Sequence, residues 1–481
     1  MTNKSADQLY RERFDRYTTA LRNGVPDRIP IRPFAAEFTA KYAGYTCQEV
    51  THDYEKAFAA VRKCATDFDW DAVVPNMVYV WTGLTQAIGL NYYGVPGIHV
   101  PADTGFQYRE PSEERAHMLP EEYDHLIDDP TGFLFNVWLP RVSDEVSPLG
   151  TPTSYRNNLS FLKGGMAMLS YFTAFGPQIE RLRTETGTLS AIGGNFKAPL
   201  DIIGDKLRGY LGLTMDLLER PEKVQAACEA LMPHLLHMGL SGADPEKHAP
   251  IGFWMHRGCT PFVTQEQFDL YYWPTLKPII EAFWSNGHQT LFYAEGDWTA
   301  HLEAFAELPE GSMVFHLDRT DVGEAARVLG KKFCLSGGIP NALLAYGTPD
   351  EVRAKCKQVI DTAAQDGGYI MDASAIIQND ARVENVKAMT DFTRGYGVYG
   401  DATGALAAAP RKPASHAAAD AVIAMPEAIR GSRIKPGACI AWEEQVGKLP
   451  AISGDAGLVR KVWEDVDALG YMYIWHCLLS F

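Results

Sequence analysis

Long apolar runs are missing from this sequence of 481 residues. The longest apolar stretches, such as residues 71–83, are interrupted by Pro75 and Asn76 and are shorter than the ~20 residues that cross a bilayer. Residues 1–13 alternate charged and polar side chains and have no apolar centre of the kind that a signal peptide needs. We therefore expect a cytoplasmic protein without a transmembrane helix and without a membrane partner.

Closely spaced cysteines and an excess of positive charge are missing as well. The eight cysteines form no Cys-x-x-Cys pair and no short Cys/His spacing of a structural zinc site, so we expect reduced, mostly buried thiols. The formal net charge is -16. A chain without a basic face cannot gain the counterion release that drives binding to nucleic acids. We expect no nucleic-acid partner.

Apolar and aromatic residues, in contrast, are plentiful. Hydrophobic residues make up 46% of the chain, and there are 10 Trp, 22 Tyr and 22 Phe. This composition excludes wholesale disorder and is sufficient for a sizeable core. The length allows one barrel of eight strand–helix units, which takes about 250 residues, together with additions.

Short β-branched or aromatic runs alternate with helix-like stretches along the chain. Alternation of this kind requires parallel pairing through crossover helices. We therefore predict an α/β fold, a (β/α)8 TIM barrel with an insertion after strand 2 and a C-terminal extension; an open doubly wound sheet is the alternative. The predicted strands are residues 28–32, 71–75, 189–192, 251–255, 290–293, 313–316, 332–335 and 369–371.

Three additions to the barrel are expected within or after residues 1–402. An insertion at about residues 84–185 is far longer than an ordinary connection and is typical of a lid or a partner surface. Residues 403–419 are an Ala/Pro-rich linker, and residues 420–481 are a C-terminal extension with an apolar end. An exposed apolar tail would be a liability, so we expect it to pack on the barrel or on a second subunit of a homodimer.

Several motifs resemble the uroporphyrinogen decarboxylase superfamily. One group lies in residues 10–33 and contains Arg13, Gly24 and Pro26–Ile31. The resemblance covers about residues 8–400 and implies a TIM barrel. It also implies one of the superfamily's activities, which include porphyrinogen decarboxylation and zinc-dependent methyl transfer that involves corrinoid proteins. The second group of motifs is Leu335–Pro340, Tyr346–Val352, Gly367–Met371 and Glu384–Met389.

The site residues of the known branches are only partly present. Decarboxylases of the family have an arginine-rich segment after strand 1 and an aspartate after strand 2. Here Arg32–Glu37 keeps one arginine, and residues 71–78 have no acid at the expected place, which disfavours uroporphyrinogen itself as the substrate. The methyltransferases have His-x-Cys after strand 5 and Cys after strand 8; here Tyr293–Glu295 and Ser374–Ala375 stand instead. At least two zinc thiolates are therefore missing, and we predict no metal site.

Residues at the carboxyl ends of barrel strands converge at one mouth. We predict His316, Glu295 and Asp297 as catalytic residues. An acid-rich mouth would raise the pKa of His316 and keep it protonated, which suits a general acid. Arg257 and Arg319 could hold an anionic group, although local ion pairs are the alternative. The other substrate-binding candidates are His256, Asp318, Tyr293, Trp298, Gly337 and Gly338.

The resemblance favours a small-molecule enzyme for methyl (one-carbon) transfer or demethylation. A corrinoid supplied by a partner protein is the candidate cofactor, and a metal is less expected. The alternative function is a decarboxylase or lyase that acts on a carboxylated or aromatic substrate. A third interpretation, a catalytically inactive binding barrel, follows from the missing thiolates.

Overall fold

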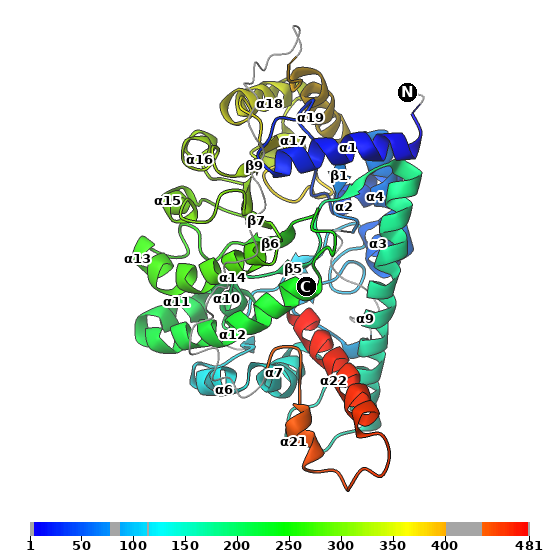
Figure 1. Cartoon of the computed structure of the whole chain (residues 1–481), viewed down its shortest axis with the longest axis vertical. Coiled ribbons are helices and arrows are strands. Elements are labelled where there is room, and N and C mark those ends of the chain that lie inside the picture. Colours follow the sequence, from blue (N-terminus) through cyan, green and yellow to red (C-terminus); the bar gives the residue numbers. More distant parts are fainter. Residues whose placement is uncertain (1–3, 77–86, 113–114, 401–434, 480–481) are drawn as a thin grey trace.

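The computed structural model describes residues 4–76, 87–112, 115–400 and 435–479 (Figure 1). It is a mixed α/β fold with parallel strands at the centre and helices around them. Within the described residues, no helix is both long and apolar enough to cross a membrane.

Two parallel sheets form the centre. One has six strands in the order β10-β9-β8-β7-β6-β5, and the other pairs β1 with β4. Every residue of β7 and β8 is buried, as expected for parallel strands covered on both faces. The strands are β1 Ala72–Val73, β4 Leu189–Ser190, β5 Asn195–Phe196, β6 Ile251–Met255, β7 Thr290–Ala294, β8 Met313–Leu317, β9 Cys334–Gly337 and β10 Tyr369–Ile370.

The named strands do not by themselves form a closed barrel. The predicted first strand, residues 28–32, forms isolated bridges rather than a regular strand. Its backbone nevertheless links the two sheets. Met371 N–H donates to the carbonyl of Pro30 (2.9 Å), and Asp71 N–H donates to the carbonyl of Ile31 (2.9 Å). Proline has no N–H to donate, so Pro30 and Pro33 interrupt a regular ladder here.

Helices cover the outside of the strands. The helix α18 (Pro349–Ala363) shows why they start where they do: Thr348 caps its first turn, and Pro349 occupies the first helical position. The other helices of the described barrel region are α1 Ala6–Leu21, α2 Glu37–Ala43, α3 Cys47–His52, α4 Tyr54–Asp67, α10 Pro199–Ile202, α11 Gly209–Glu219, α12 Pro221–Ser241, α13 Gln265–Gln267, α14 Trp273–Ser285, α15 Leu302–Phe305, α16 Val322–Val328, α17 Asn341–Tyr346 and α19 Val383–Tyr396.

Between β1 and β4 the described chain forms a further layer. It contains the antiparallel pair β2 (Tyr93–Gly94) and β3 (Gln107–Tyr108) and the long helix α9 (Tyr155–Arg181). Short helices α6 Tyr123–Asp128, α7 Pro130–Phe133 and α8 Leu139–Val142 lie between them in sequence. The predicted linker, residues 403–419, lies outside the described residues.

The C-terminal extension packs against its own chain. Its helix α22 (Ala456–Leu479), which follows α21 (Trp442–Val446), lies against α9 and α7 (Figure 1). Trp475 is fully buried, stacks on His234 with ring centroids 4.7 Å apart, and donates its indole N–H to Thr131. The apolar tail therefore buries one face within the chain, and a homodimer stays a prediction.

This packing predicts the effect of replacing Trp475 of α22 with a smaller residue. Trp475→Ala should destabilise the fold by about 3–5 kcal/mol because it leaves a cavity between α22 and α12. Val462→Ala, on the exposed face of the same helix, should change stability by less than about 0.5 kcal/mol. Urea unfolding followed by circular dichroism measures both. Equal effects of the two variants would contradict this docking.

Candidate active site at the carboxyl ends of the strands

One buried carboxylate gathers three basic side chains beyond the ends of β5 and β6. Asp205 accepts hydrogen bonds from Lys197 Nζ (2.7 Å), His256 Nε2 (2.7 Å) and Arg257 Nε (2.6 Å). Lys197 directly follows β5, and His256 and Arg257 directly follow β6. We call these four residues the Asp205 cluster.

A second buried aspartate holds the loop that carries the cluster. Asp201 accepts the backbone N–H groups of His256 and Arg257, both at 2.9 Å, and the hydroxyl of Tyr272 at 2.7 Å. Asp201 and Asp205 lie one helical turn apart, in α10 and the helical turn that continues it. The two carboxylates therefore fix both the backbone and the side chains at the end of β6.

The charges of the cluster shift two pKa values in opposite directions. Burial would raise the pKa of Asp205, but His256, Lys197 and Arg257 together hold it well below its usual range. Burial lowers the pKa of His256, but Asp205 outweighs this, and the pKa of His256 is raised. His256 therefore keeps its proton to higher pH than a free imidazole does.

When His256 is protonated, three cations of the cluster surround the single carboxylate of Asp205. Three further carboxylates lie around them: Glu110 pairs with Arg257 at 3.1 Å, and Asp201 and Glu295 lie beside His256. His256 Nδ1 has no hydrogen-bond partner among the described residues. An N–H without an internal partner and nearby cationic side chains together suit an anionic ligand that receives a proton.

A buried lysine adjoins the cluster. Lys206 Nζ donates to the hydroxyl of Tyr93 (3.2 Å) and lies 4.6 Å from the ring centre of Tyr92. Burial, followed by the charge of Lys197, lowers the pKa of Lys206 well below its ordinary value. Neither Lys206 nor Asp205 was expected from the sequence, because both lie in a helical turn rather than after a strand.

The predicted acidic residues lie in two different settings. Glu295 is exposed after β7, and its charge helps to raise the pKa of both His256 and Asp318, so the three share the mouth. Asp318 accepts the N–H of Gly296 at 2.8 Å, and burial raises its pKa. Asp297 instead accepts hydrogen bonds from the backbone N–H and the hydroxyl of Thr299, the first residue of a short helical turn.

The predicted binding residues are similarly divided. Arg257 pairs with Asp205 and Glu110. These contacts correspond to the local ion pairs considered above as the alternative to binding of an anionic substrate group. Arg319 is exposed next to Asp318. Trp298 is fully buried against the rings of Tyr272 and Phe292, which disfavours its predicted contact with a substrate.

The expectation that His316 is a protonated acid is wrong. His316 is completely buried, and burial, followed by the charge of Arg32, lowers its pKa well below the ordinary value. Its Nε2 lies 3.1 Å from the carbonyl of Ser374 and its Nδ1 lies 3.0 Å from the hydroxyl of Ser336. The charged groups beside the ring are Arg32, 3.3 Å from Nδ1, and Asp372, 3.9 Å from Nδ1, rather than Glu295 or Asp297.

Two other predicted residues surround His316. Tyr293 is also buried and stacks on the imidazole with ring centroids 4.3 Å apart. Gly337 has a φ of 86°, and an added Cβ would lie 2.5 Å from the carbonyl oxygen of Leu317. The space beside Gly337 is therefore filled by β8, and not by a ligand; Gly338 also has a positive φ, 93°.

The described residues do not fit the zinc site of the family's methyltransferases. Among the described residues, the acidic and basic side chains Asp201, Asp205 and His256 lie close enough together to hold an ion. Both Asp205 oxygens already face cations, however, and those of Asp201 face hydrogen-bond donors. The thiol nearest this group is Cys259, whose pKa burial raises to about 12, so it is not a thiolate.

A further buried carboxyl lies after the first predicted strand. Glu37 is the first residue of α2, is completely buried, and lies close to Gly105 and Gln378. Burial raises its pKa to about 7, although backbone N–H groups, including that of Phe106, oppose the shift. Glu37 is therefore protonated in the folded state over much of the acidic range.

Comparisons with known proteins agree with the motifs. Residues 167–396 match the family model described as uroporphyrinogen decarboxylase (URO-D). A curated uroporphyrinogen decarboxylase of Anaeromyxobacter dehalogenans (strain 2CP-C) is 31% identical over 137 residues, which are 28% of this chain and 38% of that protein. The matched region thus spans less than half the length of that relative. The family recognition is confirmed for the segment that contains the Asp205 cluster.

A solved structure was also found to be similar. A methyltransferase from Methanosarcina mazei matches with a TM-score of 0.49 and 15% sequence identity. The match covers 79% of this chain and 98% of the methyltransferase chain.

Glu37 predicts a pH dependence of stability. The folded carboxyl holds its proton up to about pH 7, whereas the ordinary value is 4.5. Its contribution to stability is therefore fully present below pH 4.5 and is lost as the pH rises to about 7, on the order of 3 kcal/mol. Glu37→Gln should remove this loss. Urea midpoints measured from pH 4.5 to 8 test it, with the exposed Glu310→Gln as the control; parallel profiles for wild type and Glu37→Gln would refute it.

Proposed function

We propose that this chain, whose residues 167–396 belong to the uroporphyrinogen decarboxylase family, is a small-molecule enzyme that removes a one-carbon group from an anionic substrate, with His256 as the proton donor. One observation carries the proposal. Asp205 holds His256 through Nε2 and raises its pKa, while Nδ1 has no partner among the described residues.

The fold in this proposal is a closed (β/α)8 barrel. The two parallel sheets and residues 28–32 form its wall, and the segment around Ile31 connects β10 to β1. The hydrogen bonds on both sides of Pro30 and Ile31 support this closure. The Asp205 cluster then lies at the carboxyl-terminal mouth, where barrel enzymes carry their catalytic residues.

Decarboxylation is the reaction that the described groups support best. The cationic side chains of Lys197 and His256 would bind a substrate anion. The bond between the departing carboxyl group and the substrate carbon breaks, and its electron pair takes the proton from His256 while carbon dioxide leaves. Water then returns a proton to His256. Each group that this scheme requires is present in the cluster.

Methyl transfer is the second candidate, because the superfamily that the motifs resemble includes methyltransferases. There the methyl group passes to an acceptor, and the electron pair left on the substrate takes the proton from His256. A partner corrinoid protein is the candidate acceptor. No metal-dependent step is part of this scheme, because the described residues do not fit the zinc site.

Replacing His256 tests the proposal. His256→Gln should lower turnover by about 10²- to 10⁴-fold, because glutamine cannot donate a proton in the reaction. In the wild type, kcat should fall as the pH rises through the pKa of His256, above the ordinary 6.5, because only the protonated form is an acid. His125→Gln, at an exposed histidine on α6, should leave turnover unchanged.

One assay tests both candidate reactions, decarboxylation and methyl transfer. Purified protein is incubated with a panel of aromatic carboxylates, and separately with methyl donors and methylcobalamin, while carbon dioxide and demethylated product are measured. Carbon dioxide supports the first candidate and demethylated product supports the second. Near-normal turnover by folded His256→Gln would remove His256 from the mechanism, and ligand binding without either product would favour the inactive binding barrel.

A further inference from the structure

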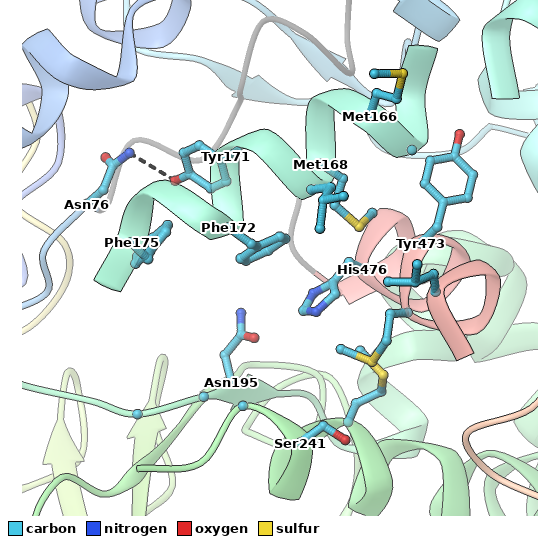
Figure 2. A pocket seen from close by; sticks show the side chains of 18 of the residues that line it. Asn76, Met166, Met168, Tyr171, Phe172, Phe175, Asn195, Ser241, Tyr473 and His476 are labelled. Carbon is cyan, nitrogen blue, oxygen red and sulfur yellow. Dashed lines mark hydrogen bonds between the residues drawn. The ribbon is translucent and has the colours of Figure 1, made fainter. Parts of the chain in front are cut away.

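A large apolar pocket lies beside the Asp205 cluster. Its volume is about 890 Å³, which is large enough for a ligand of several fused rings. The ends of β1 and β4, residues 192–195 and Trp254 of β6 form its inner wall, and α9 and α22 form its outer walls. Figure 2 shows Phe172 and Phe175 of α9, Asn195 of the strand side and His476 of α22 around the same space.

The described lining carries no charged side chain. It contains no Asp, Glu, Lys or Arg, and burial lowers the pKa of His476 to about 4, so its imidazole is neutral. Four phenylalanine and four methionine residues are among those that line the walls, and methionine adapts to irregular ligands. This lining favours an uncharged apolar group, in contrast to the cationic cluster.

Two adjacent strands connect the pocket to the cluster. Asn195 lines the pocket, and Lys197 of the cluster follows it by two residues. Trp254 lines the pocket, and His256 follows it by two residues. Residues two apart on a strand share a face and are separated by about 7 Å.

The shared face is the inner one. Phe196, which lies between Asn195 and Lys197, packs against Phe283 of the outer helix α14, so its two neighbours point to the opposite side. Trp254 stacks on Tyr293 inside the sheet. The four cluster residues do not themselves line the pocket, so a ligand that touches both the apolar wall and the cationic cluster must extend about 7 Å beyond Asn195 and Trp254.

We propose that the substrate is an amphiphile: a rigid apolar body larger than one aromatic ring occupies this pocket, and a single carboxylate binds Lys197 and His256. The part of this inference that concerns the carboxylate rests on the proposed function. A small molecule suits the pocket better than a partner helix, because the pocket extends inward to Trp254 and a helix with side chains is about 10–12 Å wide.

Binding of a graded series of ligands tests the inference without using catalysis. The probes are benzoate, 2-naphthoate and 1-pyrenecarboxylate, with 1-pyrenemethanol as the uncharged counterpart of the last. Calorimetry or pyrene fluorescence measures Kd on the full-length protein. Burial of each added ring should tighten binding, by about tenfold or more from benzoate to 1-pyrenecarboxylate. 1-Pyrenemethanol should bind about tenfold more weakly than 1-pyrenecarboxylate, because it lacks the charge-assisted contacts.

Two matched glycine variants test the position of the ligand. Gly165 lines the pocket on α9, and an added Cβ would meet no atom within 4 Å, so the side chain of Gly165→Leu begins in open space. It should weaken 1-pyrenecarboxylate binding by about tenfold and leave benzoate within about twofold. Gly395→Leu in α19 has the same open surroundings away from the pocket and should change neither.

Lys197→Met tests the link to the cluster. It removes one cation while His256 and Arg257 still pair with Asp205. It should reduce the preference of 1-pyrenecarboxylate over 1-pyrenemethanol, because only His256 remains to bind the carboxylate. Affinities that do not depend on ring number, or on Gly165→Leu, would overturn the pocket assignment. If affinity increases with the number of rings but 1-pyrenecarboxylate and 1-pyrenemethanol bind equally well, the proposal that the substrate is an amphiphile is overturned. Both failures are distinct from failure of the proposed function, which appears as unchanged turnover in His256→Gln.

Discussion

The ion cluster around Asp205 is the constraint on which the rest of the site depends. A buried carboxylate is tolerated only when opposite charges and donors surround it, and here Lys197, His256 and Arg257 supply them. These partners come from the ends of two neighbouring strands, and Asp205 itself lies in the helical turn before α11. The same ion pairs that satisfy Asp205 thus hold the register of β5 against β6 and orient the imidazole. The contacts that satisfy Asp205 therefore also keep the candidate donor His256 protonated.

The strands were readable from the sequence because their apolar runs are short and contain β-branched or aromatic residues. Seven of the predicted runs coincide with parallel strands, whereas residues 28–32 form only isolated contacts, because the prolines around Ile31 cannot donate. Barrel closure and the domain boundaries stay predictions. The family motifs were readable as well, and they fall largely within the matched residues 167–396.

The site was predicted less well, for a reason that lies in strand geometry. A histidine at the end of a β run can point into the mouth or into the barrel interior, and the sequence does not distinguish the two. His316 lies within β8 and is buried beside Arg32, whereas His256 lies one residue beyond β6 and keeps a polar environment. Asp205 and Lys206 carry no local signal, since an apolar helical turn surrounds them in sequence. Only the tertiary contact with Lys197 reveals their role.

The placement of α22 has a consequence for the free energy of the chain's last helix. Its residues Val466, Leu469 and Tyr473 form part of the pocket wall, so the pocket is complete only when this helix is docked. Occupancy and docking are then thermodynamically linked, and each must favour the other by the same free energy. A ligand in the pocket would therefore stabilise the docked helix. The resistance of α22 to proteases would then increase when the pocket is filled.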